Sequence, residues 1–303
     1  MIMIEKKHAI HTFSPEHPPA ASVPAGETVT FETYDCYKGQ LLEPGTTFAE
    51  VDRKLGNPAT GPLFVEGAEK GDVLKVEILE ILLDPVGILD IGPTSGCLGR
   101  MFEKCVIKRL PVKDNVIYYE DLQIPARPMV GVIGVAPEQE AVSTMSPKNH
   151  GGNMDCTRIT AGSTLYLPVK ATGALLAMGD LHAVMGDGEA GNCGVEIGGR
   201  VTVRVTVLKE LDLEYPMIEN PGQWITVAYG DTVDQACERC TLQMFEFLTG
   251  HAGIDSVDAG MYIDMLGSQA VCQVVNPYKT VRMEMDKWIV GHAGFHGFRE
   301  SGL

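Results

Sequence analysis

Residues 200–207 read RVTVRVTV, a strict alternation of valine with arginine or threonine. Because successive side chains of a strand point to opposite faces, this pattern predicts a strand with one buried face and one solvent-facing face. Residues 28–33 (TVTFET) and 73–81 (VLKVEILEI) are also typical of strands. The 34 glycines and 18 prolines indicate many turns between such runs. The sequence therefore predicts a mainly β fold, a sandwich or barrel with antiparallel strands.

The pattern changes after about residue 210. Residues 231–249 carry an apolar stripe at helical spacing, with Asp231 or Thr232 to cap the start and Gly250 to end the helix. A short helix around 257–265, a strand at 270–275 and a glycine-rich end containing His292 and His296 are expected to follow. We therefore predict a β-sandwich core over residues 1–210 that carries the polar site clusters, and a smaller α/β part over residues 211–303 packed on it.

Composition excludes several classes of protein. A net charge of −16 and scattered basic residues argue against nucleic acid as a partner. The first twenty residues carry charges and prolines where a signal peptide needs an apolar run, and no apolar run is long enough to span a membrane. We therefore expect a cytoplasmic protein with no membrane partner, whose eight cysteines are reduced. Cys237 and Cys240 lie on the apolar helical face and are predicted to be core thiols.

Two polar clusters carry the candidate chemistry. The first, residues 149–155, reads NHGGNMD and is either a polar turn or a group of ligands. The second, residues 179–189, reads GDLHAVMGDGE and follows an apolar run. If that run is a strand, Asp180 and His182 project from the same face. A turn at Gly186-Asp187-Gly188 then brings Glu189 back toward them, although such a sequence is also a common hairpin turn.

One strand-length segment, residues 163–175, separates the two clusters. A hairpin or a strand–loop–strand connection would bring the clusters to the same end of a sheet, and we predict a joint site there. Imidazole and carboxylate oxygens together suit zinc or a harder cation. Such an ion can lower the pKa of a bound water, and a nearby carboxylate can move the proton. This outline fits hydrolysis of a small acyl compound.

Other hydrolytic and cofactor chemistries fit less well. The sequence has no G-x-S-x-G elbow, no phosphate-binding G-x-x-x-x-G-K-[ST] loop and no dinucleotide fingerprint after a strand. Cys156, next to Asp155 and near His150, is an alternative nucleophile. A second alternative is a non-catalytic β-sandwich that binds calcium or a small ligand, since calcium prefers oxygen ligands. The two histidines, His150 and His182, favour a softer ion or a proton carrier.

The sequence resembles the acetamidase/formamidase family over nearly its whole length. The most specific stretches occur in order: residues 128–137 (PMVGVIGVAP), 150–155 (HGGNMD), 162–169 (GSTLYLPV), 173–176 (GALL), 179–183 (GDLHA) and 186–189 (GDGE). The sequence departs from the family pattern at Met185 and Cys156, which affects the choice of amide.

The resemblance implies a jelly-roll-like (CUB-like) antiparallel β-sandwich with a smaller α/β part, and hydrolysis of short aliphatic amides to acid and ammonia. It also implies a homo-oligomer and a bound divalent metal ion, for which we expect zinc, with calcium as the alternative. Carried over by position, the pocket residues are Asn153, Asp155, Asp180, His182 and Glu189, with His150 beside them. We assign Asp155, Asp180, His182 and Glu189 to the metal, and Glu189, Asn153 and His150 to catalysis.

Overall fold

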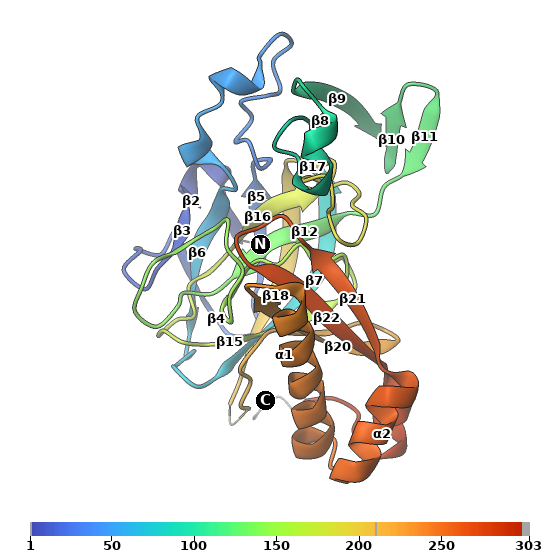
Figure 1. The fold of residues 1–303 in the computed structure, drawn as a ribbon. Coiled ribbons are helices and arrows are strands. Elements are labelled where there is room, and N and C mark those ends of the chain that lie inside the picture. The colour runs from blue at the N-terminus through green and yellow to red at the C-terminus, as the bar shows by residue number, and fades with distance from the viewer. Residues whose placement is uncertain (1, 210, 299–303) are drawn as a thin grey trace.

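The computed structural model describes residues 2–209 and 211–298, and Figure 1 shows them as large β-sheets with helices gathered at one end. The first sheet runs in the order β1 (Ile2–Ile4), β5 (Thr28–Thr33), β18 (Gly199–Leu208), β7 (Val73–Leu83), β15 (Thr164–Pro168), β19 (Met217–Glu219), β20 (Gln223–Gly230), β22 (Lys279–Asp286) and β21 (Ser268–Gln273). Apart from the parallel pair β1–β5, its neighbours are antiparallel.

The second sheet carries the polar clusters. Its main path is β11 (Leu122–Pro125), β10 (Val116–Tyr119), β9 (Val106–Lys113), β8 (Val86–Ile91), β17 (Glu196–Ile197), β16 (Leu176–His182), β12 (Met129–Gly134) and β14 (Gly151–Asn153). Strand β6 (Ala59–Glu66) joins β16 and pairs with β2 (Ala9–Ile10) and β4 (Ala21–Pro24). A short pair, β3 (Thr12–Phe13) and β13 (Val142–Ser143), stands apart.

The predicted strand at residues 200–207 is confirmed as β18, between β5 and β7. Val201, Val203 and Val205 are fully buried on one face. On the other face the Arg204 guanidinium donates to both carboxylate oxygens of Glu77, at 2.7 and 2.6 Å. The alternation therefore fixes which face of this strand enters the core, because a shift by one residue would bury the arginines.

The main hydrophobic core lies between the two sheets. Phe31, Val76 and Val201 of the first sheet belong to the same cluster of buried side chains as Val130 and Met178 of the second. The predicted mainly β, antiparallel sandwich with a smaller C-terminal α/β part is confirmed.

The C-terminal helices pack on the last strands of the first sheet (Figure 1). The predicted helix at 231–249 is α1 (Val233–Glu246), capped by the Thr232 side chain and continued by a π-helical turn at Phe247–His251. Two shorter helices follow, α2 (Ser256–Leu266) and α3 (Lys287–His292). Cys240 is fully buried in this second core, so the prediction of a core thiol is confirmed for it, whereas Cys237 is only partly buried and packs against that core.

Strands β19 to β22 extend the same sheet as β18, and all eight cysteines are unpaired. The boundary drawn at residue 210 stays a prediction, and residue 210 itself and residues 299–303 of the glycine-rich end lie outside the described residues. None of the helices in the described ranges combines the length and the apolar character needed to cross a bilayer.

Candidate functional site

The two polar clusters meet because β12 lies between them. Val132 of β12 pairs with Asn153 of β14 on one side and with Gly179 of β16 on the other. The connecting strand β15 belongs to the other sheet, so a hairpin is the wrong route between the clusters. Asp180 and His182 project to the same side of β16, as predicted, and the Asp180 Oδ1–His182 Nε2 distance is 3.9 Å.

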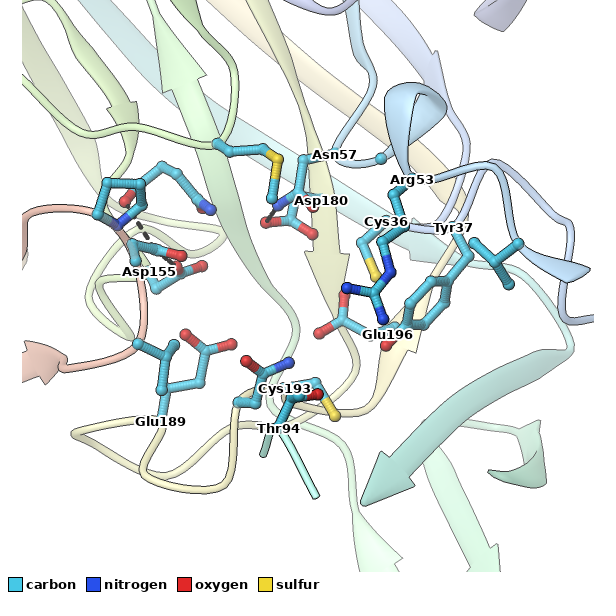
Figure 2. Close-up of a pocket in the computed structure, with 18 of the residues that line it drawn as sticks. Cys36, Tyr37, Arg53, Asn57, Thr94, Asp155, Asp180, Glu189, Cys193 and Glu196 are labelled. Carbon is cyan, nitrogen blue, oxygen red and sulfur yellow. Dashed lines mark hydrogen bonds between the residues drawn. The ribbon is translucent and has the colours of Figure 1, made fainter. Parts of the chain in front are cut away.

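A pocket of about 300 Å³ opens over these strands (Figure 2). Four carboxylates line it, those of Asp155, Asp180, Glu189 and Glu196. They are deeply buried, with exposed fractions of 1%, 2%, 7% and 2%. Of the side chains that line the pocket in the described part of the chain, Arg53 alone is cationic, and it is exposed. The pocket therefore concentrates negative charge in a region of low solvent access.

Three of these carboxylates come from strained backbone positions. Asp155, Asp180 and Glu189 have φ values of 45°, 56° and 44°, in the left-handed region that side chains with a Cβ rarely adopt. Each such residue costs on the order of 1–3 kcal/mol, and such positions cluster at active sites and ligand-binding sites. All three side chains line the pocket, so the strained backbone coincides with the acidic wall of the site.

Gly131 of β12 makes room for the carboxylates. A Cβ at this position would lie 2.5 Å from Asp155 Oδ1 and 2.8 Å from the Asp180 carbonyl oxygen. Its own carbonyl accepts from the backbone N–H groups of Met154 and Asp155, at 3.1 and 3.2 Å. A glycine in the centre of this strand therefore lets two acidic residues approach the backbone from both sides.

Three asparagine side chains hold the carboxylates in place. With its amide nitrogen facing the carboxylates, Asn153 donates to Asp155 Oδ2 at 3.0 Å and to Asp180 Oδ2 at 3.1 Å. Its oxygen accepts from Asn57 Nδ2 and Asn276 Nδ2, at 3.1 and 3.2 Å. Asn57 also donates to Asp180 Oδ2 at 2.9 Å, and Asn276 to Asp155 Oδ2 at 2.6 Å. The Asn153 amide thereby uses all of its hydrogen-bonding capacity inside the protein.

His182 lies next to the pocket and contacts Glu196, its direct partner across strands β16 and β17. The His182 Nε2–Glu196 Oε1 distance is 2.9 Å, and both side chains are at most 2% exposed. Burial alone would lower the pKa of His182, but the carboxylates of Glu196, Asp180 and Asp155 outweigh it and hold this pKa well above the usual range.

Burial and mutual repulsion raise the pKa values of the acidic groups. Burial, followed by the charge of Glu196, raises the pKa of Asp180 well above its usual range. Burial and the charge of Asp155 do the same to the pKa of Glu189. Burial also raises the pKa of Asp155, and His182 and Asn276 partly offset that rise. Groups with pKa values shifted in this way are candidates for proton transfer or for binding a cation.

The turn that presents Glu189 is anchored by the C-terminal strands. The buried Arg282 of β22 donates to both carboxylate oxygens of Asp187, at 2.9 and 2.7 Å. The Gly188 N–H donates to the Cys272 carbonyl at 2.9 Å, and Gly188 O accepts from Val274 N at 3.1 Å. The predicted Gly186-Asp187-Gly188 turn is thus fixed by contacts about 90 residues away in sequence, which the local pattern could not reveal.

The structure places most of the residues proposed from sequence in or beside this pocket. Asn153, Asp155, Asp180 and Glu189 line it, and His182 contacts one of its walls. His150 does not line it; its ring packs edge-on against Phe13 with a centroid separation of 5.0 Å. Cys156 and Met185 are buried outside the lining, so Cys156 is not placed to attack a molecule held there.

We predict that His150 makes the stability of the protein depend on pH. Burial, with a smaller effect of Lys148, lowers the pKa of His150 from 6.5 to about 3. Between these pH values the unfolded chain binds a proton that the folded chain does not, so stability is complete above pH 6.5 and falls as the pH drops. The expected slope from this group is about 1.4 kcal/mol per pH unit.

Denaturant unfolding of the wild type and of His150→Leu at several pH values measures this contribution. The variant should show a shallower fall in the free energy of unfolding below pH 6.5. Equal slopes in the two proteins would contradict a buried, neutral His150. The same variant tests the catalytic role assigned from sequence, because a loss of turnover with unchanged stability would return His150 to the site.

Sequence reasoning missed Glu196, Asn57 and Asn276. Glu196 lies on β17 opposite His182, and strand register is not visible in the sequence alone. Asn57 and Asn276 each precede a proline, in Asn57-Pro58 and Asn276-Pro277, a pair that signals a turn and not a ligand. Only the packing of these turns against the second sheet makes them part of the site.

Two groups of side chains in or beside the pocket have the composition of a metal site. Ligand atoms of Asp155, His182 and Glu189 lie within 4.8 Å of one another, and so do those of Cys36, Asp180 and Glu196. Several of their buried atoms, among them Asp180 Oδ1, Glu189 Oε2, His182 Nδ1 and Glu196 Oε2, have no hydrogen-bond partner. Unpartnered buried polar atoms are rare, so these residues fit a divalent cation.

Comparison with known proteins identifies the protein family of this chain. The sequence model of the acetamidase/formamidase family matches residues 2–143 and 138–234. The chain belongs to this family. The resemblance found from the motifs around the pocket is thereby confirmed.

Solved structures of this family share the whole fold. A protein described as a "predicted acetamidase/formamidase" from Thermoanaerobacter tengcongensis has a TM-score of 0.95 and 39% identity, covering 98% of this chain and 99% of its own. An acetamidase from Bacillus halodurans has a TM-score of 0.94 and 39% identity, over 97% of this chain and 100% of its own. The acetamidase of Mycolicibacterium smegmatis is 26% identical in sequence, over 74% of each chain.

Proposed function

We propose that this protein is an amidase that hydrolyses a short aliphatic amide, of the formamide or acetamide class, to the carboxylic acid and ammonia. Membership of the acetamidase/formamidase family supports this reaction. The observation that carries it is the convergence of Asp155, His182 and Glu189, all buried and all with raised pKa values, at a pocket of about 300 Å³.

We propose that Asp155, His182 and one oxygen of Glu189 hold a divalent ion, with Asp180 beside them. The histidine favours zinc, and calcium is the alternative because most of the donors are oxygens. When bound, such an ion polarises a carbonyl group and lowers the pKa of water. The unpartnered atoms of His182 and Glu189 support a ligand at this position.

Glu189 is the residue that we propose to move the proton. Hydrolysis forms a bond between the amide carbon and a water oxygen and breaks the carbon–nitrogen bond, and the departing nitrogen needs a proton from the water. Burial, followed by the charge of Asp155, raises the pKa of the Glu189 carboxyl well above its usual range, which makes this group a better proton acceptor than an ordinary carboxylate. The Glu189 oxygen that does not hold the ion is the one that we propose to carry this proton.

Asn153 is proposed to position the carboxylates. The sequence suggested that its amide orients the substrate, but both ends of that amide are engaged by Asp155, Asp180, Asn57 and Asn276. We therefore propose that Asn153 holds the carboxylates of Asp155 and Asp180 at a fixed separation. Arg53 and Phe48, at the exposed side of the pocket, are then placed to contact the substrate.

The sequence also suggested a location and an assembly state. We propose that the protein is cytoplasmic and forms a homo-oligomer, as the family resemblance implies. Light scattering of the purified protein measures the assembly state directly, and a monomer at assay concentration would contradict the second proposal.

An assay of ammonia release tests the function. Purified protein is supplied in turn with zinc, manganese, magnesium or calcium and with formamide, acetamide or a longer amide. We expect ammonia from at least one short amide, loss of that activity after chelator treatment and its return with zinc. No ammonia under any combination would refute the amidase, whereas activity that survives complete removal of metal would refute the ion alone.

A further inference from the structure

We infer that the preferred substrate is an amide whose neutral, apolar acyl group has roughly five to seven carbon atoms, and that Phe48 recognises this group. The inference rests on the proposed function in taking an amide as the substrate and in placing its carbonyl group beside Asp155 and Glu189. It adds the size of the acyl group and the side chain that selects it. Formamide and acetamide are then turned over less efficiently than longer amides.

The pocket is larger than a short amide requires. An apolar cavity of about 150 Å³ holds benzene, which has six non-hydrogen atoms. At the same value of roughly 25 Å³ per atom, the pocket of about 300 Å³ holds about twelve such atoms. A metal ion and an attacking water replace two or three of them, and acetamide adds only four. Space for roughly five further carbon atoms therefore remains in the pocket.

Part of the pocket lining is apolar. Phe48 and Val51 line it and are half-buried, and neither packs against the hydrophobic cores formed by the described residues. Met145, also in the lining, is 46% exposed. Apolar side chains that face an open pocket without packing on a core leave apolar surface in contact with water, and a ligand that covers this surface is favoured. A formyl or acetyl group is too small to cover these three side chains.

Phe48 lies across the pocket from the residues that we propose to act on the amide. Its ring is edge-on to Tyr37, with a centroid separation of 5.9 Å, and 5.3 Å from Arg53 Cζ. Figure 2 shows Tyr37 and Arg53 on the opposite side of the pocket from Asp155 and Glu189. The ammonia that leaves carries no substituent, so the part of the substrate that crosses the pocket toward Phe48 is the acyl group.

The short helix that carries Phe48 is fixed in place. Glu50 Oε2 caps its start by accepting from Thr47 N at 2.7 Å and from Thr47 Oγ1 at 2.8 Å. The Arg109 guanidinium donates to the Glu43 carbonyl at 2.7 Å, which ties the preceding residues to β9. A ring that is already held loses little freedom when a ligand packs against it, so Phe48 is suited to bind an apolar group.

The acidic character of the pocket disfavours an anionic acyl group. Arg53 is the one cationic side chain of the described lining and it is exposed, whereas four carboxylates are buried in the same pocket. One divalent ion balances at most half of the charge that those carboxylates carry when ionised. Water and salt screen the attraction of an exposed guanidinium more than the repulsion between buried charges. A neutral apolar group avoids this repulsion.

The selectivity between hexanamide and acetamide tests this inference. In the wild type, kcat/KM for hexanamide should exceed that for acetamide by at least about tenfold, since one fully buried methylene is worth about fourfold. Phe48→Ala should lower this ratio by at least about fivefold. Leu42→Ala is the matched control and should keep the wild-type ratio, because Leu42 lies in the same segment, is 40% exposed and does not line the pocket. Succinamate, which ends in a carboxylate, should be a poorer substrate than hexanamide.

Titration calorimetry measures binding apart from turnover. The metal-reconstituted Glu189→Gln variant, which is expected to consume amides slowly, should bind hexanamide at least about tenfold more tightly than acetamide. Adding Phe48→Ala to this variant should remove most of that difference.

Each outcome bears on one proposal. A kcat/KM for acetamide equal to or above that for hexanamide would overturn the inference and leave the amidase in place, whether or not Phe48→Ala folds. A preference for hexanamide that persists unchanged in Phe48→Ala, or succinamate as the best substrate, would also overturn it. Tight binding of hexanamide that depends on Phe48, in a protein that cleaves no amide, would support the apolar wall while refuting the amidase.

Discussion

The His182→Ala variant is expected to lose turnover of short amides by more than about 10³-fold and to bind less than its full complement of metal. Removing the imidazole takes away one ligand, and a single missing contact around a metal can already cost 10–100-fold. In the metal-free protein it also leaves Asp180 and Glu196, each 2% exposed, without the protonated imidazole between them. Breaking a buried ion pair in this way destabilises a protein by about 3–5 kcal/mol.

Steady-state ammonia release, metal analysis and thermal unfolding measure these three effects together. His8→Ala is the matched control, because His8 is exposed and outside the pocket, and it should behave as the wild type. Wild-type turnover and metal content in His182→Ala would remove His182 from the site. A variant that unfolds at the assay temperature would be examined as His182→Asn, which keeps a polar side chain in the same space.

The Glu189→Gln variant is expected to lower kcat by about 10²–10⁴-fold, the range that positioned proton transfer contributes. The amide has the length and shape of the carboxyl group but cannot carry the proton from water to the departing nitrogen. Because Glu189 is buried beside Asp155, the neutral side chain also relieves repulsion, so stability should be equal or greater. A fall in kcat with unchanged or increased stability separates a chemical role from a structural one.

Kinetics on Glu189→Gln and on Glu27→Gln test this expectation, since Glu27 is exposed and remote from the pocket. A kcat within a few-fold of the wild type would transfer the proton step to another carboxylate, with Asp180 the first to examine. A large increase in KM at constant kcat would instead assign Glu189 to substrate binding.

The sequence predicted the parts of this protein that follow local rules. The alternating valines of 200–207 predicted a strand, the face of it that is buried and an antiparallel sheet around it. These predictions were possible because period-two patterning is a local signal. The Asp180–His182 pair was placed on one face for the same reason. The helix α1 was found from its stripe and its threonine cap, although its end was placed three residues late, because a π-helical turn follows it.

The remaining parts of the site depend on packing between distant segments. Glu196 reaches His182 through the register of β16 and β17, and Asn276 reaches Asp155 from 121 residues away. The sequence did not mark Gly131 as a site residue, because its role is to leave room for Asp155 and Asp180 and it has no side chain of its own. His150 shows the converse: a histidine in the most distinctive motif packs against Phe13 in the interior. Residue type and proximity in sequence could not distinguish it from a ligand.

Proton NMR of formamide and of acetamide, each incubated with the metal-reconstituted protein, tests the central claim most directly, with ammonia measured in the same samples. Hydrolysis in the carboxylate pocket predicts that at least one of the two amides gives its carboxylic acid and ammonia in equal amounts, at a rate that falls by at least about 10²-fold in Glu189→Gln. Formamide and acetamide that both persist unchanged in the wild-type samples would contradict it.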